Sequence, residues 1–274
     1  MRPSVSLRVV QYGIGYLFAF LSLYPVFLMV SSSLKTTIEI FKKPLAFPGK
    51  LSFAAYANLL DQLPFGRFLW NSIFVSGISV IIILISCSLA SYYIARTSFK
   101  WNGALMFIFL LGMMIPIKLG IVPLFLLMRD IGFIDSSWSL ISIYSAMGIP
   151  LGVMILTGFF RTLPRELEEA AKIDGCTDMQ ILGRIILPLM RPALGTVMII
   201  NFVTAWNDFF FPLIFIQSEM KKTIPVGMMS LFGEYASDWS TLFAGLTLAS
   251  LPMIVIFIIA SKQFMDGMTA GAVK

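Results

Sequence analysis

One segment of this chain reads Glu168-Glu-Ala-Ala-Lys-Ile-Asp-Gly-Cys-Thr-Asp-Met-Gln-Ile-Leu-Gly-Arg-Ile-Ile-Leu-Pro188, and it differs from the apolar sequence on either side. Eight charged residues fall within 165–184. Pro164 suits a first helical position, and acidic residues fill the first turns, where the helix dipole favours negative charge. Gly175 is a natural helix stop, and Thr177-Asp-Met-Gln180 forms a capping box for a second helix. We therefore predict a helix–turn–helix outside the lipid.

The rest of the chain has the composition of an integral membrane protein. Of its 274 residues, 58% are hydrophobic and only 12% are charged, against about 25% charged in soluble proteins. The net charge of +6 lies mostly between apolar runs, where bilayer orientation explains it, so nucleic acid is not an expected partner. There is no histidine, and Cys87 and Cys176 lie in different surroundings, so neither a metal site nor a disulfide is expected.

Charge-poor runs of about 20 residues or more, the length that crosses the hydrocarbon core, define the fold. The predicted spans are 9–33, 69–94, 103–128, 137–160, 193–217 and 239–261. We therefore predict an all-α integral membrane protein with six transmembrane helices, in which 1–274 form a single transmembrane domain. The helix–turn–helix of 164–188 lies between spans four and five.

Lysines and arginines indicate the orientation. When the long loop of about 34–68 is left out, they favour a cytoplasmic N-terminus. An even number of spans then places both termini and the segment 161–191 in the cytoplasm.

The predicted helix–turn–helix has two interpretations. Leu167, Ala170, Ala171 and Asp174 share one helix face, and its alanines let another surface come close. The segment either docks on another protein or rests on lipid headgroups. The excess of acids slightly disfavours lipid, because the cytoplasmic leaflet is itself negative. Periodicity alone leaves both interpretations open.

A family resemblance favours docking. Glu169-Ala-Ala171, Gly175 and Ile185-x-Leu-Pro188 fill every fixed position of the "EAA loop" of permease subunits in ABC-type importers. Trp206-Asn-Asp208 and the closing Gly267-Met-Thr-Ala-Gly-Ala-Val-Lys274 resemble the carbohydrate-uptake branch. Within that branch, almost the whole chain is similar to the shorter of two permeases, the second permease of the maltose transporter.

The resemblance implies a role for the loop. It would dock into a groove on a cytoplasmic ATPase, with Glu169 in an ionic contact and Gly175 making the turn. The implied ATPase-coupling residues are Glu169, Ala170, Ala171, Asp174, Gly175, Ile185, Leu187 and Pro188. The implied partners are a second permease subunit, an ATPase dimer and an extracytoplasmic solute-binding protein. The implied location is a bacterial or archaeal cytoplasmic membrane, and the implied cargo is a sugar or oligosaccharide.

The chain carries no Gly-x-x-x-x-Gly-Lys-[Ser/Thr] phosphate loop. We therefore expect no enzyme activity and no cofactor in this chain, with ATP and Mg²⁺ bound by the partner ATPase.

Two regions are candidate linings of a translocation path. Trp206, Asn207 and Asp208 lie in the fifth predicted span, where an acid is costly and suggests function. Asn207 and Asp208 either line the path or tie this helix to its neighbours. Lys118, in the third span, either extends to the interface or contacts a polar substrate.

The alternative function is a gradient-driven secondary transporter of a small polar solute. Such a protein needs coupling-ion sites, and the spans offer only Asp208 and Lys118. A membrane enzyme is a third class, but no nucleophile arrangement supports it.

Overall fold

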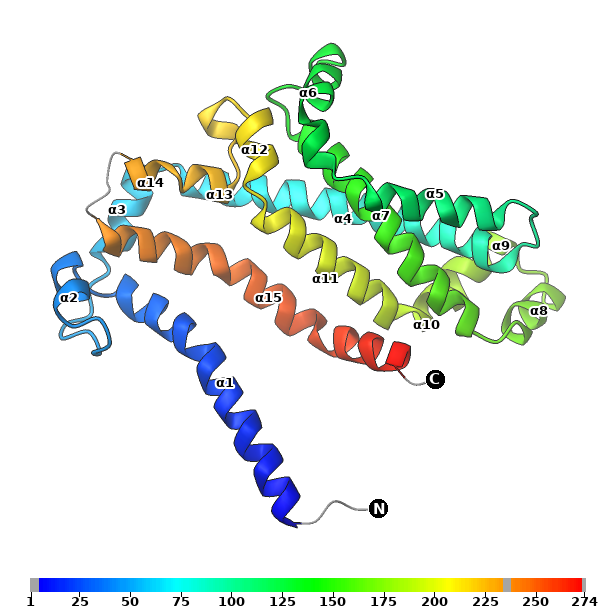
Figure 1. Ribbon diagram of the computed structural model, residues 1–274, viewed down its shortest axis with the longest axis horizontal. Helices are drawn as coiled ribbons and strands as arrows, with labels where there is room; N and C mark the ends of the chain where they lie inside the picture. The colour runs from blue at the N-terminus through cyan, green and yellow to red at the C-terminus, as the bar shows by residue number, and fades with distance from the viewer. Residues whose placement is uncertain (1–4, 234–237, 273–274) are drawn as a thin grey trace. The chain divides into compact units, whose positions relative to one another are not determined.

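The computed structural model describes residues 5–233 and 238–272, and all regular structure in these ranges is helical. The chain forms two compact units, whose helices are labelled in Figure 1. One comprises Met1–Gly66 with Gly227–Leu251, and the other Arg67–Val226 with Pro252–Lys274. The fold class predicted from composition is therefore confirmed as all-helical.

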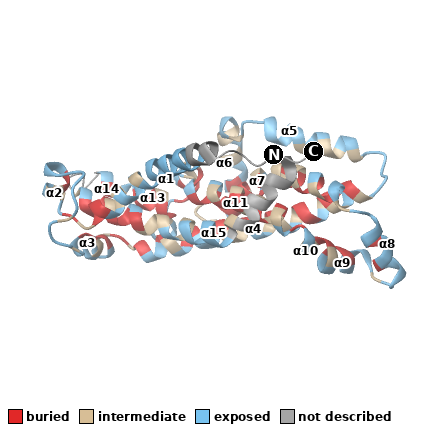
Figure 2. Ribbon diagram, turned by 90° about the horizontal axis from the view of Figure 1, so that it is seen from below, coloured by how far each residue is buried: buried red, intermediate tan, exposed pale blue. Residues whose placement is uncertain are grey.

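The second unit is built on three long helices. They are α4 (Phe65–Arg96), α7 (Ser137–Thr162) and α11 (Arg191–Asn207), with α5 (Asn102–Met114) packed on α7. Glycines of α7 allow close approach: a Cβ at Gly148 would lie 2.2 Å from Asn201 Oδ1, and one at Gly152 would lie 2.5 Å from Cys87 Sγ. Small residues at helix contacts serve this purpose in membrane bundles. Buried residues accordingly follow α7 and α11 (Figure 2).

The first unit contains α1 (Val5–Ser33), α2 (Thr37–Lys42), α3 (Ala54–Gln62), α14 (Ser230–Gly233) and the first part of α15 (Trp239–Ala272). Asp238 joins α2 to α15, because its Oδ1 accepts hydrogen bonds from Thr37 Oγ1 at 3.1 Å and from Thr241 N at 3.2 Å. Burial acts to raise the pKa of Asp238, but hydrogen bonds from Ser240, Thr241 and Thr37 outweigh it and lower the pKa.

Shorter helices complete the described chain. They are η1 (Ile117–Gly120), α6 (Ile121–Asp130), α12 (Phe210–Phe215), η3 (Glu219–Lys221) and α13 (Ile224–Gly227), together with the segments that follow α7.

Helices α1, α4, α7 and α15 are each long and apolar enough to cross a membrane. Two further candidates are bent pairs, 102–114 with 117–130 at 73°, and 178–189 with 191–207 at 79°. The described residues therefore offer four to six spans.

The structure corrects two predicted helix boundaries. The third predicted span breaks at Ile115, because the following Pro116 disfavours helical backbone and lacks an N–H. The fifth ends at Asn207. Asp208 has extended backbone, and its Oδ2 accepts a hydrogen bond from Phe211 N at 3.0 Å, so the side chain competes with the helical pattern.

Asp135 fixes the start of α7. Its φ of 57° lies in the left-handed region. Its Oδ1 accepts from Gln217 N at 3.0 Å and Ser218 N at 2.8 Å, and its Oδ2 accepts from Lys221 Nζ at 3.0 Å. Burial acts to raise the pKa of Asp135, but hydrogen bonds from Ser218, Lys221 and Gln217 outweigh it and hold the pKa well below its usual range.

Candidate functional site

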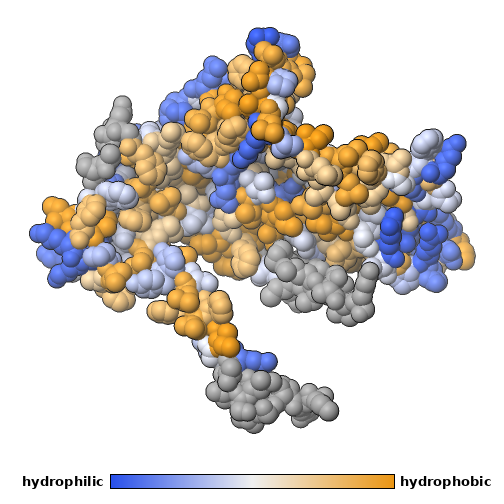
Figure 3. Space-filling view, in the orientation of Figure 1, coloured by the Kyte–Doolittle hydropathy of each residue, from blue (hydrophilic) through white to orange (hydrophobic). Residues whose placement is uncertain are grey.

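The predicted helix–turn–helix is present. Helix α8 (Glu166–Ile173) is followed by α9 (Asp178–Ile181), the π-helical η2 (Leu182–Ile186) and α10 (Leu187–Leu189). Helix α8 begins with Arg165 as its N-cap, so Pro164 precedes the helix and does not occupy its first position. Hydrophilic residues gather at this end of the second unit (Figure 3).

The turn has the backbone geometry that the glycine predicts. Gly175 has a φ of +81°, a conformation that is costly for residues with a Cβ. Gly175 N donates to Lys172 O at 3.0 Å, and Cys176 N donates to Ala171 O at 2.9 Å. This pair of bonds is a Schellman motif, which ends α8.

The capping box of the second helix is confirmed. The Thr177 hydroxyl accepts from Gln180 N at 3.4 Å, and the Gln180 side chain accepts from Thr177 N at 2.9 Å. Two amide groups at the start of α9 are therefore satisfied locally.

One side of the segment belongs to the core of the bundle. Ala171, Ile181, Leu182 and Ile186 are buried in a single cluster with residues at the ends of α4 and α7, such as Phe160. The helix–turn–helix is therefore packed on the ends of α4 and α7 and is not a free loop.

The other side is open. Ile173, which is not among the predicted coupling residues, is 87% exposed. The predicted coupling residues themselves differ in exposure. Glu169, Ala170, Asp174, Gly175 and Pro188 are exposed, Ile185 and Leu187 are half-buried, and Ala171 is buried. The predicted shared face of Leu167, Ala170, Ala171 and Asp174 is thus split, because Ala171 turns to the core.

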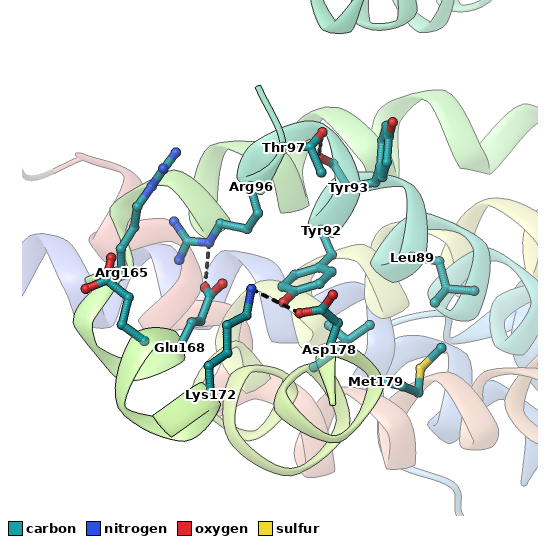
Figure 4. A pocket seen from close by; sticks show the side chains of 12 residues that line it. Leu89, Tyr92, Tyr93, Arg96, Thr97, Arg165, Glu168, Lys172, Asp178 and Met179 are labelled. Atoms are coloured by element: carbon teal, nitrogen blue, oxygen red, sulfur yellow. Dashed lines mark hydrogen bonds and ion pairs between the residues drawn. The ribbon is translucent and has the colours of Figure 1, made fainter. Parts of the chain in front are cut away.

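The structure adds a residue pair that sequence reasoning missed. Arg96 Nε lies 2.6 Å from Glu168 Oε1, and the two side chains are only 9% and 10% exposed (Figure 4). Neither atom has a hydrogen-bond partner in the described structure, so their contact is an ion pair without hydrogen-bond alignment. Arg96 Nη2 also donates to Leu163 O at 3.0 Å. The sequence carries no local signal for this pair, because Arg96 and Glu168 lie far apart in the chain.

A cavity of about 470 Å³ lies beside this pair, between the end of α4 and the helix–turn–helix. Its charged lining consists of Arg96, Arg165, Glu168, Glu169, Lys172 and Asp178. Lys172 Nζ and Asp178 Oδ1 form a second ion pair at 3.2 Å, with both side chains more than half exposed. Glu169 therefore lies at the edge of a mixed-charge hollow.

The candidate path residues occupy different environments. Trp206 is 4% exposed, and its ring stacks on Phe202 with centroids 5.4 Å apart. Asn207 is exposed, whereas Asp208 Oδ2 accepts a hydrogen bond from Tyr144 of α7 at 2.9 Å. The tie to a neighbouring helix is therefore present for Asp208.

Lys118 lies near the break that follows α11 at Asp208. Its Nζ is 5.1 Å from the centre of the Phe210 ring, a cation–π distance. A smaller cavity of about 140 Å³ lies between α7 and α11, lined in part by Tyr144, Asn201 and Thr204. Polar groups thus line both α11 and the break that follows it.

Comparison with known proteins places the chain in context. Residues 82–269 match the family described as "Binding-protein-dependent transport system inner membrane component". The chain is 37% identical to a putative ABC transporter permease protein of Caldicellulosiruptor sp., with 91% of each chain covered. It is 34% identical to the melibiose/raffinose/stachyose import permease protein MelC of Bacillus subtilis, again with 91% of each covered.

Solved structures give a matching fold. A chain of a bacterial ABC transporter involved in the import of the acidic polysaccharide alginate superposes with a TM-score of 0.82 at 23% identity. The superposition covers 96% of this chain and 99% of that one.

Proposed function

This chain belongs to the family of binding-protein-dependent transport system inner membrane components, and we propose that it is a permease subunit of an ATP-driven importer for a sugar or oligosaccharide. Relatives with 31–34% identity are named for the transport of melibiose, raffinose and stachyose and of arabinooligosaccharides. Their names support the cargo class.

We propose that 164–188 is the coupling loop, and one observation carries this proposal. Helix α8 buries Glu168 and Ala171 against the bundle, while Glu169, Ala170 and Ile173 are exposed on its other side. A large aliphatic side chain that is 87% exposed beside an alanine and a carboxylate suits a protein partner, because desolvating it is favourable. Motion of that partner would pass through the buried side to the spans.

The rest of the complex follows from this role. The chain has no phosphate loop, so a separate cytoplasmic ATPase dimer binds ATP and Mg²⁺. A second permease supplies the other half of the path, and an extracytoplasmic binding protein delivers the solute. In this proposal six spans, two of them bent, form one transmembrane domain with both termini and the coupling loop in the cytoplasm.

The path would run along the polar side of α11. Thr204 and Asn207 are exposed one helical turn apart, and Asp208 follows at the break. Neutral amide and hydroxyl groups suit the hydroxyl groups of a sugar. Trp206 would support this surface from behind, because it is buried against Phe202.

The test is uptake by the purified complex in proteoliposomes. Glu169→Lys combined with Gly175→Pro should abolish ATP-driven uptake, because proline cannot adopt a φ of +81°. Glu166→Lys reverses a charge on an exposed position of the same helix and is the matched control. Full uptake by the double variant would contradict the coupling role.

The same vesicles test the gradient-driven alternative. Uptake should require ATP on the side of the membrane that carries the ATPase. It should persist when ionophores collapse ion gradients. Uptake that stops with the ionophore and continues without ATP would favour a secondary transporter.

A further inference from the structure

Helix α8 has a narrow attachment to the bundle. Over Glu166–Ile173, Glu168 and Ala171 are the two buried residues. Ala171 contributes one methyl group to the core cluster. Glu168 contributes a carboxylate, whose partner is the last residue of α4.

Arg96 holds more than one element. Its Nε pairs with Glu168 of α8 at 2.6 Å, and its Nη2 donates to Leu163 O, at the end of α7, at 3.0 Å. The planar guanidinium presents several donors in a fixed fork, so one side chain can hold both groups at once. The position at the C-terminal end of α4 also suits a cation, because the helix dipole is negative there.

The rest of α4 is in turn fixed to α7. Ser91 Oγ donates to Val153 O at 3.1 Å, and Cys87 Sγ donates to Ile149 O at 3.3 Å. A force on α8 that reaches Arg96 would therefore reach two long helices together.

We propose that Arg96 is a positioning residue that makes α8 move as one body with the ends of α4 and α7. This inference rests on the proposed coupling function. The buried ion pair is weak evidence for stability, since charges lose hydration on burial. Its use is mechanical: without it, α8 keeps its outer docking surface, and Ala171 is the one buried residue of α8 that still packs on the bundle.

The test measures sugar uptake per ATP hydrolysed by the purified complex in proteoliposomes. Glu168→Gln keeps the side-chain shape and removes the charge, and Arg96→Met removes both bonds. Each should lower uptake per ATP by about 2- to 30-fold, the range of coupling changes along such networks. A loss of structure alone would lower the amount of assembled complex and leave this ratio unchanged.

Matched controls are Glu166→Gln on α8 and Arg161→Met at the end of α7, both at exposed positions; each should keep the wild-type ratio. The double variant should resemble the single variants, because all three lose the same link. Should Arg96→Met fail to insert, Glu168→Gln decides the question.

An unchanged ratio in Glu168→Gln would overturn the role of Arg96 while leaving the proposed function intact. Wild-type uptake that needs no ATP would instead contradict the proposed function, and the inference would fall with it.

Discussion

Gly175 offers a graded test of the turn that joins α8 to α9. A Cβ at this position would meet no atom within 4 Å, so crowding does not contribute. The cost of Gly175→Ala is therefore that of a φ of +81°, about 1–2 kcal/mol for a residue with a Cβ. Such a cost shifts the equilibrium between the formed and the open turn toward the open form by about 5- to 30-fold. Gly175→Asn should cost less, because asparagine enters this region more readily.

Hydrogen exchange of the segment 166–181 measures this opening equilibrium. The amide of Cys176 is bonded to Ala171 O at 2.9 Å. Its protection from exchange should be highest with Gly at position 175 and should fall through Asn and Ala to Val. Gly183→Ala is the control, because a Cβ there also meets nothing and φ is not positive. Equal protection in the Gly175→Ala and Gly175→Val variants, or an equal loss of protection in Gly183→Ala, would show that the positive φ does not set the stability of this turn.

Three further predictions concern the bundle. Gly148→Ala should destabilise the protein by about 1–3 kcal/mol through overpacking, whereas Gly158→Ala, where a Cβ meets nothing, should be neutral in thermal unfolding. Tyr144→Phe should cost about 1.5–3 kcal/mol, because it leaves the Asp208 carboxylate without this donor; a melting temperature equal to wild type would contradict this. Asp135→Asn should destabilise the protein at neutral pH. Because the folded pKa of Asp135 is depressed, its stabilisation is fully present above the unfolded pKa of about 3.9, so the difference from wild type should shrink only as the pH falls below it.

The local features of the helix–turn–helix of 164–188 were predictable from the sequence. Gly175 and the Thr177–Gln180 capping box follow from neighbouring residues, since the backbone groups that they satisfy lie within a few positions. The long uninterrupted helices α4 and α7 follow in the same way from apolar runs.

Features that depend on distant residues were not predictable. Glu168 and Arg96 are far apart in the chain, and periodicity did not reveal that Glu168 turns inward while Glu169 turns outward. The end of α11 depends on the Asp208 side chain, which bonds Tyr144 and Phe211 N. A hydropathy run contains no sign of these partners.

Cross-linking tests the proposed contact between the exposed side of α8 and the ATPase. A photo-activatable residue at Ile173, which is 87% exposed, should cross-link in the purified complex to the subunit that hydrolyses ATP. The same residue at Ile181, which is fully buried, should not. Capture of lipid alone at position 173 would rule out this contact. Capture of the ATPase instead from the exposed Phe47, in the loop between α2 and α3, would do the same.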